Sequence, residues 1–389
     1  MQKLLSVTAL LAVALTSACA SVSRTDRSID DLVQAAPAEN ARQERVVTQS
    51  LVTLADRVVA QQSEHIDILM LSGGGQNGAY GIGFMRGWQQ HADSPMPEFD
   101  IITGISTGAL QVPFVALNNP DDLAMGADLF RNAADSFAPT LDWWFWLRPT
   151  GGIVNTSRYE RTIADVMDVE YCHSLQPLFA EGRQLFIGTT NLDLATGRVW
   201  SLDTEMGDCN DLSGVHDRFY ASTAIPGIFP PRMIDDHLHV DGGVVSNMLV
   251  LYGMDEYRQL AELLAERGIT NDVEVRVWVI LNLWTHMDMM ALQPSKRRAL
   301  DSRSRWAMLW AQQPQVLERL EYLALAVSYD VPGLTMSVRH TGIPSTMATE
   351  PGATDLFNRA WMERIEQYGF ERAQSDEPWD TLVSPFIRP

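Results

Sequence analysis

The sequence predicts an α/β fold with a mostly parallel, buried central sheet. Two apolar runs of strand length, residues 66–71 and 99–104, each end in a glycine-rich turn. A helical apolar pattern over residues 107–117 follows the second run. Strand-length runs that alternate with helical patterns are typical of parallel sheets covered by helices. By the same criteria we expect further strands at residues 184–188 and 273–283.

Length and composition indicate an ordinary globular protein. The 389 residues are 46% hydrophobic and 20% charged, which argues against extensive disorder. Acidic residues outnumber basic ones and give a formal net charge of −20. A chain this acidic lacks the electrostatic footprint of a nucleic-acid-binding protein. It also gains little from anionic headgroups, so we expect membrane attachment to come from a lipid or an apolar surface.

The N-terminal residues predict export. A short positive start precedes an apolar run over residues 4–15, which is too short to cross a bilayer. We expect a signal peptide over residues 1–18, with Cys19 as the first mature residue and the carrier of the lipid. The protein would then be a membrane-anchored lipoprotein of the cell envelope, with the outer membrane as one candidate location. Ordinary cleavage after Ala20, giving a periplasmic protein, stays open because an A-x-A pattern ends there.

The remaining cysteines are Cys172 and Cys209. Two cysteines in an oxidising compartment either pair or stay as free buried thiols, and the sequence does not decide between these outcomes. No grouping of Cys and His has metal-ligand spacing, and neither H-E-x-x-H nor C-x-x-C occurs. We therefore expect no metal site.

The motifs divide the chain beyond the signal peptide into three segments. Residues 19–63 are predicted to form a tether and an accessory helix, with the helix at residues 43–61. Residues 64–255 are predicted to form the core that carries the motifs. Residues 256–389 are expected to add a C-terminal strand and helices that complete or cover this core.

The strongest motif is G-I-S-T-G, with Ser106 between Gly104 and Gly108, directly after a predicted strand and at the start of a predicted helix. A nucleophile elbow requires this context, because the tight turn exposes the serine and the glycines leave room for the backbone. The helix N-terminus favours developing negative charge. A glycine-rich turn without catalytic function is the competing interpretation.

A second glycine-rich segment follows the first predicted strand and contains Gly73, Gly74, Gly75 and Gly78. Consecutive glycines let backbone N–H groups approach a substrate and stabilise an oxyanion. A dinucleotide site would need an acidic residue at the far end of the next strand, whereas Asp100 lies at its beginning. A P-loop is excluded because no Gly-Lys-Ser/Thr follows.

The third motif is Asp241-Gly242-Gly243. A serine nucleophile needs a base, and an aspartate could serve only if burial raised its pKa from about 3.9. By spacing alone, a turn aspartate is the more common interpretation.

Together these motifs resemble the patatin-like phospholipase family. The match comprises the glycine loop at 72–78, the elbow at 104–108, the segment A-S-T-A-I-P-G-I-F-P-P at 221–231 and the D-G-G motif at 241–243. The resemblance implies a three-layer α/β/α patatin-like fold without a metal or organic cofactor. It also implies a dyad of Ser106 and Asp241 that cleaves a lipid or phospholipid ester through an acyl-enzyme.

Two features qualify this resemblance. Family members commonly have Arg or Lys where this chain has Asn77, so the preference for phospholipid over neutral esters is open. An aromatic run at residues 141–149 is either a lid or acyl-chain surface at a membrane interface, or a buried aromatic cluster.

Two rival functions also remain open. An α/β-hydrolase would use a Ser-Asp-His triad, with His340 or His286 as the base. A non-catalytic envelope lipoprotein would keep the fold for binding. The sequence predicts neither the preferred acyl position nor the oligomeric state.

Overall fold

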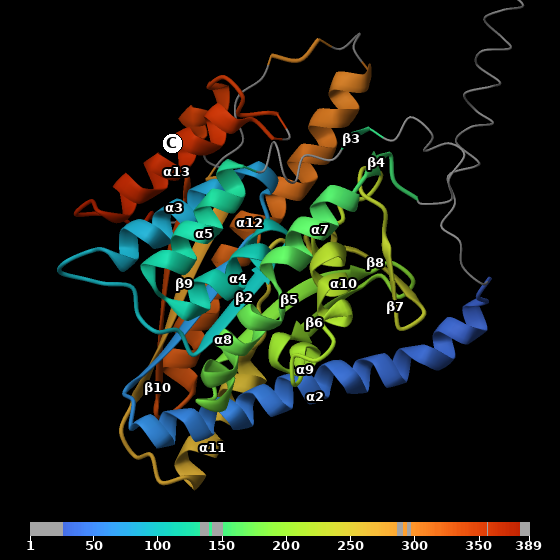
Figure 1. Cartoon of the computed structure of the whole chain (residues 1–389). Helices are drawn as coiled ribbons and strands as arrows, with labels where there is room; N and C mark the ends of the chain where they lie inside the picture. The colour runs from blue at the N-terminus through green and yellow to red at the C-terminus, as the bar shows by residue number, and fades with distance from the viewer. Residues whose placement is uncertain are drawn as a thin grey trace, which may run out of the picture.

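A computed structural model gives the structure of residues 26–132, 140–141, 151–285, 291–293, 297–355 and 357–381, and the description below is confined to them. Helices cover both faces of a central sheet (Figure 1). The strands are β1 (His65–Leu71), β2 (Ile101–Ile105), β3 (Thr140–Leu141), β4 (Val154–Asn155), β5 (Gln184–Asn191), β6 (Thr196–Ser201), β7 (Arg232–Ile234), β8 (His237–Asp241), β9 (Val273–Trp284) and β10 (Leu334–Ile343).

The α-helices within the described residues are α2 (Ile29–Gln61), α3 (Gly78–Gln89), α4 (Thr107–Leu117), α5 (Pro120–Arg131), α7 (Ser157–Val166), α8 (Val169–Ala180), α9 (Leu202–Met206), α10 (Ser213–Ser222), α11 (Met254–Glu266), α12 (Arg297–Asp330) and α13 (Arg359–Ala373). Short 3₁₀ turns lie at η1 (Gly75–Asn77), η2 (Gly242–Val244) and η3 (Ser345–Thr349). Among the helices that the structure describes, none combines the length and apolar character needed to cross a bilayer.

The main sheet has the strand order β10-β9-β1-β2-β5-β8-β7, and β6 also pairs with β5. The pairs from β10 to β5 are parallel, whereas β6, β7 and β8 are antiparallel to their neighbours. The predicted α/β fold with a mostly parallel sheet is therefore confirmed. The predicted strand at residues 99–104 is observed slightly later, at β2.

The two faces of the sheet bury different helices, as alternating side chains on β1 require. Ile66, Ile68 and Met70 belong to the apolar cluster that includes α2, α11 and α12. Leu69 and Leu71 belong to the cluster that includes α3, α4, α5, α7, α8, α10 and α13. This arrangement gives the three layers that the family resemblance implies.

The accessory helix α2 is longer than predicted. It begins at Ile29 instead of near residue 43, and Pro37 lies inside it. Ser28 caps its N-terminus, because the Ser28 side chain accepts from the Asp31 N–H while the Asp31 side chain accepts from the Ser28 N–H. Such a capping box satisfies orphan backbone donors and stabilises the start of a helix.

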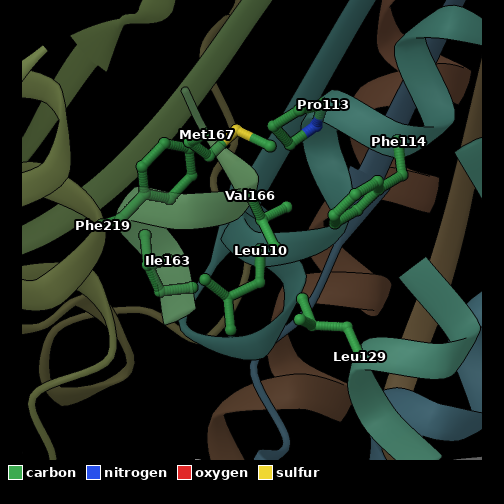
Figure 2. Close-up of a pocket in the computed structure, with 8 residues that line it drawn as sticks. All are labelled: Leu110, Pro113, Phe114, Leu129, Ile163, Val166, Met167 and Phe219. Carbon is green, nitrogen blue, oxygen red and sulfur yellow. The ribbon is translucent and has the colours of Figure 1, made fainter. Parts of the chain in front are cut away.

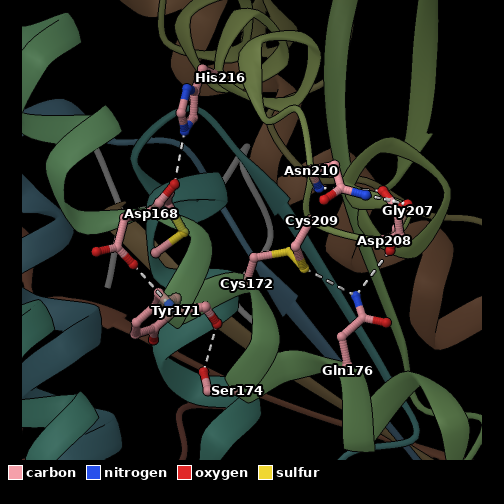
Figure 3. Close-up of a disulfide and its surroundings, with 11 residues drawn as sticks. Asp168, Tyr171, Cys172, Ser174, Gln176, Gly207, Asp208, Cys209, Asn210 and His216 are labelled. Atoms are coloured by element: carbon pink, nitrogen blue, oxygen red, sulfur yellow. Dashed lines mark hydrogen bonds between the residues drawn. A yellow bond between two sulfur atoms is a disulfide. The ribbon is translucent and has the colours of Figure 1, made fainter.

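Cys172 and Cys209 form a disulfide (Figure 3). Cys172 lies in α8 and Cys209 lies in the turn after α9, so the bond joins a helix to a turn across a sequence separation of 37 residues. Beside it, the Gln176 side chain donates to the carbonyl of Gly207 over 3.1 Å. The structure thus decides between pairing and free thiols in favour of pairing.

Candidate active site

The turn between β2 and α4 has the geometry of a nucleophile elbow. Ser106 has φ 53° and ψ −122°, a conformation that side chains other than glycine rarely adopt. A Cβ added at Gly104 would lie 2.6 Å from the Gly108 carbonyl oxygen, and one added at Gly108 would lie 2.3 Å from that of Leu71. Both glycines are therefore required for the helix to pack this closely against the strands.

Asp241 reaches Ser106 because of how three strands meet. Ile105, the last residue of β2, pairs with Gly188 of β5, and the next residue of β5, Thr189, pairs with Asp241 at the end of β8. β6 pairs with the opposite edge of β5, so β8 pairs with the same edge as β2, directly beyond the end of β2. The Ser106 hydroxyl donates a hydrogen bond of 2.6 Å to Oδ2 of Asp241.

Burial makes Asp241 a better base than an ordinary aspartate. The residue is 7% exposed, and desolvation raises the pKa of its carboxyl from 3.8 to about 6. Hydrogen bonds from the Ser106 hydroxyl and the Gly243 N–H oppose this increase. The pKa of this carboxyl thus lies closer to neutral pH than that of an ordinary aspartate, which suits a general base.

Ser222 fixes the backbone of the elbow from α10. Its hydroxyl accepts from the Ser106 N–H over 3.0 Å and donates to the Gly188 carbonyl over 2.7 Å. Ser222 is fully buried. Although it lies in the family-like segment at 221–231, no residue pattern indicates this role, because its partners come from strands distant in sequence.

The first glycine of the predicted oxyanion loop has an occupied amide. The Gly73 N–H donates to the backbone carbonyl of Asn247 over 3.2 Å, and the Asn247 side chain donates to the Gly73 carbonyl over 3.1 Å. A Cβ added at Gly73 would lie 3.0 Å from Cβ of Ser106. Gly73 therefore brings the loop against the serine, but its N–H group already has a partner.

Gly74 and Gly75 provide the amides that remain. In the part of the chain that the structure describes, neither N–H group has a hydrogen-bond partner. Gly74 precedes the 3₁₀ turn η1 and Gly75 begins it, and α3 follows directly after this turn. Gly75 has φ +60°, and a Cβ added there would meet nothing within 4 Å. Two amides without partners just before a helix, with open space beside Gly75, suit an oxyanion.

Asn77, at the position where family members commonly have Arg or Lys, contacts a tryptophan of α13. Its side-chain oxygen accepts from the indole N–H of Trp361 in α13 over 2.9 Å, and the residue is 5% exposed. Gly78, the last glycine of the loop, begins α3, where an added Cβ would lie 2.2 Å from Oγ1 of Thr107. Gly78 therefore permits close packing of α3 against α4.

His340 does not join the pair. It lies on β10, and β9 and β1 separate it from β2. At about 4.8 Å between neighbouring strands, three strand spacings place it ~14 Å from the serine strand. Burial lowers the pKa of His340 to about 4. The other candidate base, His286, lies outside the described residues.

An apolar pocket lies beside the elbow helix (Figure 2). The space between its side chains comes to about 220 Å³ when the open solvent beside them is included. The N–H of Leu110 donates to the Ser106 carbonyl over 3.3 Å, so the lining begins one helical turn from the serine. The lining residues share an apolar character: Leu110, Pro113, Phe114, Leu129, Ile163, Val166, Met167 and Phe219.

The other sequence predictions have these outcomes. Gly242 and Gly243 form η2, and a Cβ added at Gly242 would lie 2.7 Å from the Gly188 carbonyl oxygen. Within the described residues, no three His, Cys, Asp or Glu side chains gather as metal ligands would. Cys19 and the aromatic run lie outside the described residues, except for the backbone of Leu141.

Comparison with known proteins relates this site to one family model. Residues 69–253, which contain Ser106, Asp241 and the glycine loop, match the model of the patatin-like phospholipases. No curated protein sequence matches significantly. Among solved structures, the chain is similar to VipD from Legionella pneumophila, with 13% identity over 80% of this chain and 67% of that chain and a TM-score of 0.32.

Proposed function

We propose that the chain is a serine acyl hydrolase that cleaves lipid ester bonds with Ser106 and Asp241, on the premise that residues 69–253, which match the patatin-like phospholipase model, form a domain of that family. Lipid acyl hydrolysis is the general activity of that family. The observation that carries the proposal is the 2.6 Å hydrogen bond from the serine hydroxyl to the buried carboxylate.

The first half of the proposed reaction forms an acyl-enzyme. Asp241 accepts the hydroxyl proton while Oγ of Ser106 attacks the ester carbonyl. The carbonyl oxygen gains the negative charge, and the free N–H groups of Gly74 and Gly75 stabilise it. When the tetrahedral intermediate collapses, the C–O bond to the alcohol breaks and Asp241 returns the proton to that leaving oxygen.

The second half regenerates the enzyme. Asp241 removes a proton from water, the hydroxide adds to the acyl carbon, and the same two amides hold the oxyanion again. Collapse releases the fatty acid, and the proton on Asp241 returns to Oγ of Ser106. No third residue is needed in this cycle, because the carboxylate contacts the nucleophile directly.

The proposed substrate is an ester with an aliphatic acyl chain, as in a phospholipase A or lysophospholipase reaction. The cluster of apolar side chains that begins one helical turn from Ser106 supports this class. Asn77 brings no positive charge to a phosphate, and its side chain contacts Trp361 instead. We therefore propose that the enzyme selects substrates chiefly by the acyl chain, with neutral esters as well as phospholipids accepted.

Hydrolysis of a lipid panel tests the function. Wild type should release fatty acid from phospholipids, lysophospholipids and neutral esters, and Ser106→Ala should release none. A fluorophosphonate probe should label wild type but not the variant. Folded wild-type protein that neither hydrolyses any lipid nor reacts with the probe would instead support a non-catalytic binding function.

We also propose that the mature protein is an envelope lipoprotein anchored through Cys19. The Cys172–Cys209 disulfide supports export, because such bonds persist in oxidising compartments. Metabolic labelling with a palmitate analogue should mark wild type and leave Cys19→Ala unlabelled. Equal labelling of both proteins, or of neither, would overturn lipidation at this residue.

A further inference from the structure

The glycine loop is held by a residue outside the matched domain. Asn282 lies near the end of β9, beyond residue 253, and is fully buried. Its backbone N–H donates to Oγ of Ser72 over 2.8 Å, and its side-chain Nδ2 donates to the Ser72 carbonyl over 2.7 Å. The residue directly before the three glycines is thus bound from both its backbone and its side chain.

The same asparagine also binds the two helices that flank the loop. Its Oδ1 accepts from the N–H of Gly81 in α3 over 3.1 Å. Its Nδ2 donates to Oε1 of Gln111 in α4 over 3.2 Å, and Nε2 of Gln111 donates to the Gly78 carbonyl over 2.6 Å. Asn282 and Gln111 are both fully buried, and together they form an amide pair that spans the loop, α3 and α4.

The loop lies in direct contact with this asparagine. A Cβ added at Gly74 would lie 1.8 Å from the Asn282 carbonyl oxygen, and one added at Gly81 would lie 2.3 Å from its Oδ1. Because real Cβ atoms do not approach this closely, Gly74 is needed for the contact with β9 as well as for access to substrate. The position of its free N–H is therefore set by β9.

An oxyanion hole depends on such support. Its donors stabilise the transition state because they are already oriented and need no reorganisation during the reaction. Three consecutive glycines are the most flexible backbone available, so the loop does not hold that orientation by itself. A buried polar network with every partner satisfied provides the rigidity, whereas one with a missing partner is costly.

We infer that Asn282 is a positioning residue for the oxyanion hole, which it acts on through Ser72, Gly74 and the Gln111 amide. This inference rests on the proposed hydrolase function and adds to it a determinant from the C-terminal part of the chain. Asn282 touches neither Ser106 nor Asp241 in the described hydrogen-bond network.

The test compares Asn282→Asp with Asn191→Asp in the full-length protein. Asn191 is a matched control, because it is also fully buried at the end of a strand and its side chain accepts from the N–H groups of Asp193 and Leu194. On a soluble short-chain ester, Asn282→Asp should lower kcat about 10–100-fold with KM within about twofold, as a small misplacement of catalytic donors does. Asn191→Asp should keep wild-type kcat.

A second variant keeps the test decisive if Asn282→Asp does not fold. Gln111→Leu removes one of the acceptors of Nδ2, and it should lower kcat by a smaller factor in the same direction. The double variant should lose less than the product of the single losses, since the two side chains act as a pair. A wild-type kcat in either folded single variant would overturn the inference.

The failure of this inference differs from the failure of the proposed function. If wild type shows no Ser106-dependent hydrolysis, the function itself is wrong. If wild type hydrolyses the ester and folded Asn282→Asp does so equally well, the function stands and the positioning role of Asn282 is wrong.

Discussion

Oγ of Ser106 lies 2.6 Å from Oδ2 of Asp241, although 135 residues separate them in sequence. The contact follows from the pairing in the sheet, because β8 pairs with β5 directly beyond the point where β2 ends. Asp241, the last residue of β8, therefore lies beside the turn that follows β2. The Asp241 carboxylate contacts the serine hydroxyl directly, with no histidine between them.

Asp241→Asn should abolish most activity while keeping the fold. The amide has nearly the shape of the carboxylate but cannot accept the proton, so kcat should fall roughly 10²–10⁴-fold, the usual contribution of a general base. Ester hydrolysis with purified protein measures this. The matched control is His340→Gln, which should keep wild-type kcat. Wild-type kcat in Asp241→Asn together with a large loss of kcat in His340→Gln would instead support the histidine triad.

Activity should rise with pH through the pKa of Asp241. Only the ionised carboxylate accepts a proton, and burial raises that pKa to about 6. We expect the acid limb of the kcat/KM profile to lie near pH 6. A limb near 3.8, the ordinary value, would show that the carboxylate is not desolvated in solution.

Stability should depend on the same group in the opposite sense. The folded protein binds this proton more tightly than the unfolded chain, so the contribution to stability is full below pH 3.8 and is lost as pH rises through about 6. Above pH 6, Asp241→Asn should therefore unfold at a higher temperature than wild type. The difference should shrink toward pH 4 in thermal scans, and equal melting temperatures at pH 8 would contradict the expectation.

Ser222→Ala should weaken both catalysis and folding. It leaves the Ser106 N–H and the Gly188 carbonyl without their partner, which costs about 1–3 kcal/mol of unfolding free energy when the groups are buried. Since the elbow also loses its constraint, kcat should fall, and denaturant unfolding together with ester kinetics measures both effects. Wild-type stability in the variant would show that these groups find other partners.

Removing the disulfide should destabilise the protein. Cys172→Ala combined with Cys209→Ala should lower the free energy of unfolding by about 2–4 kcal/mol, because the bond closes a loop of intermediate length. Dithiothreitol should lower the melting temperature of wild type and leave that of the double variant unchanged. Two reactive thiols in unreduced, denatured wild type would contradict the pairing.

Leu110→Trp should shift the preferred acyl chain length. The larger side chain fills the pocket one turn from Ser106, so kcat/KM for long-chain esters should fall roughly tenfold relative to short-chain esters. Leu117→Trp is the control, since this residue lies on the same helix but does not line the pocket. An unchanged chain-length profile in Leu110→Trp would remove the pocket from the acyl site.

Local patterns predicted the elements close to the serine. The helix predicted at residues 107–117 is observed as α4. Its apolar pattern and the glycine turn before it are properties of neighbouring residues, so they can be read from the sequence. The helix predicted at residues 43–61 begins 14 residues earlier in the structure, because α2 starts at the Ser28 capping box and accommodates Pro37.

The sequence by itself determined the order of the motifs and the residue types that acyl transfer needs, because a glycine turn and a strand-length run are properties of neighbouring residues. Only the tertiary structure decided that Asp241 meets Ser106, that Gly73 has an occupied amide, and that Asn282 lies under the glycine loop. Each of these depends on strand register and strand order, which are set when distant segments pack and bury their polar groups together.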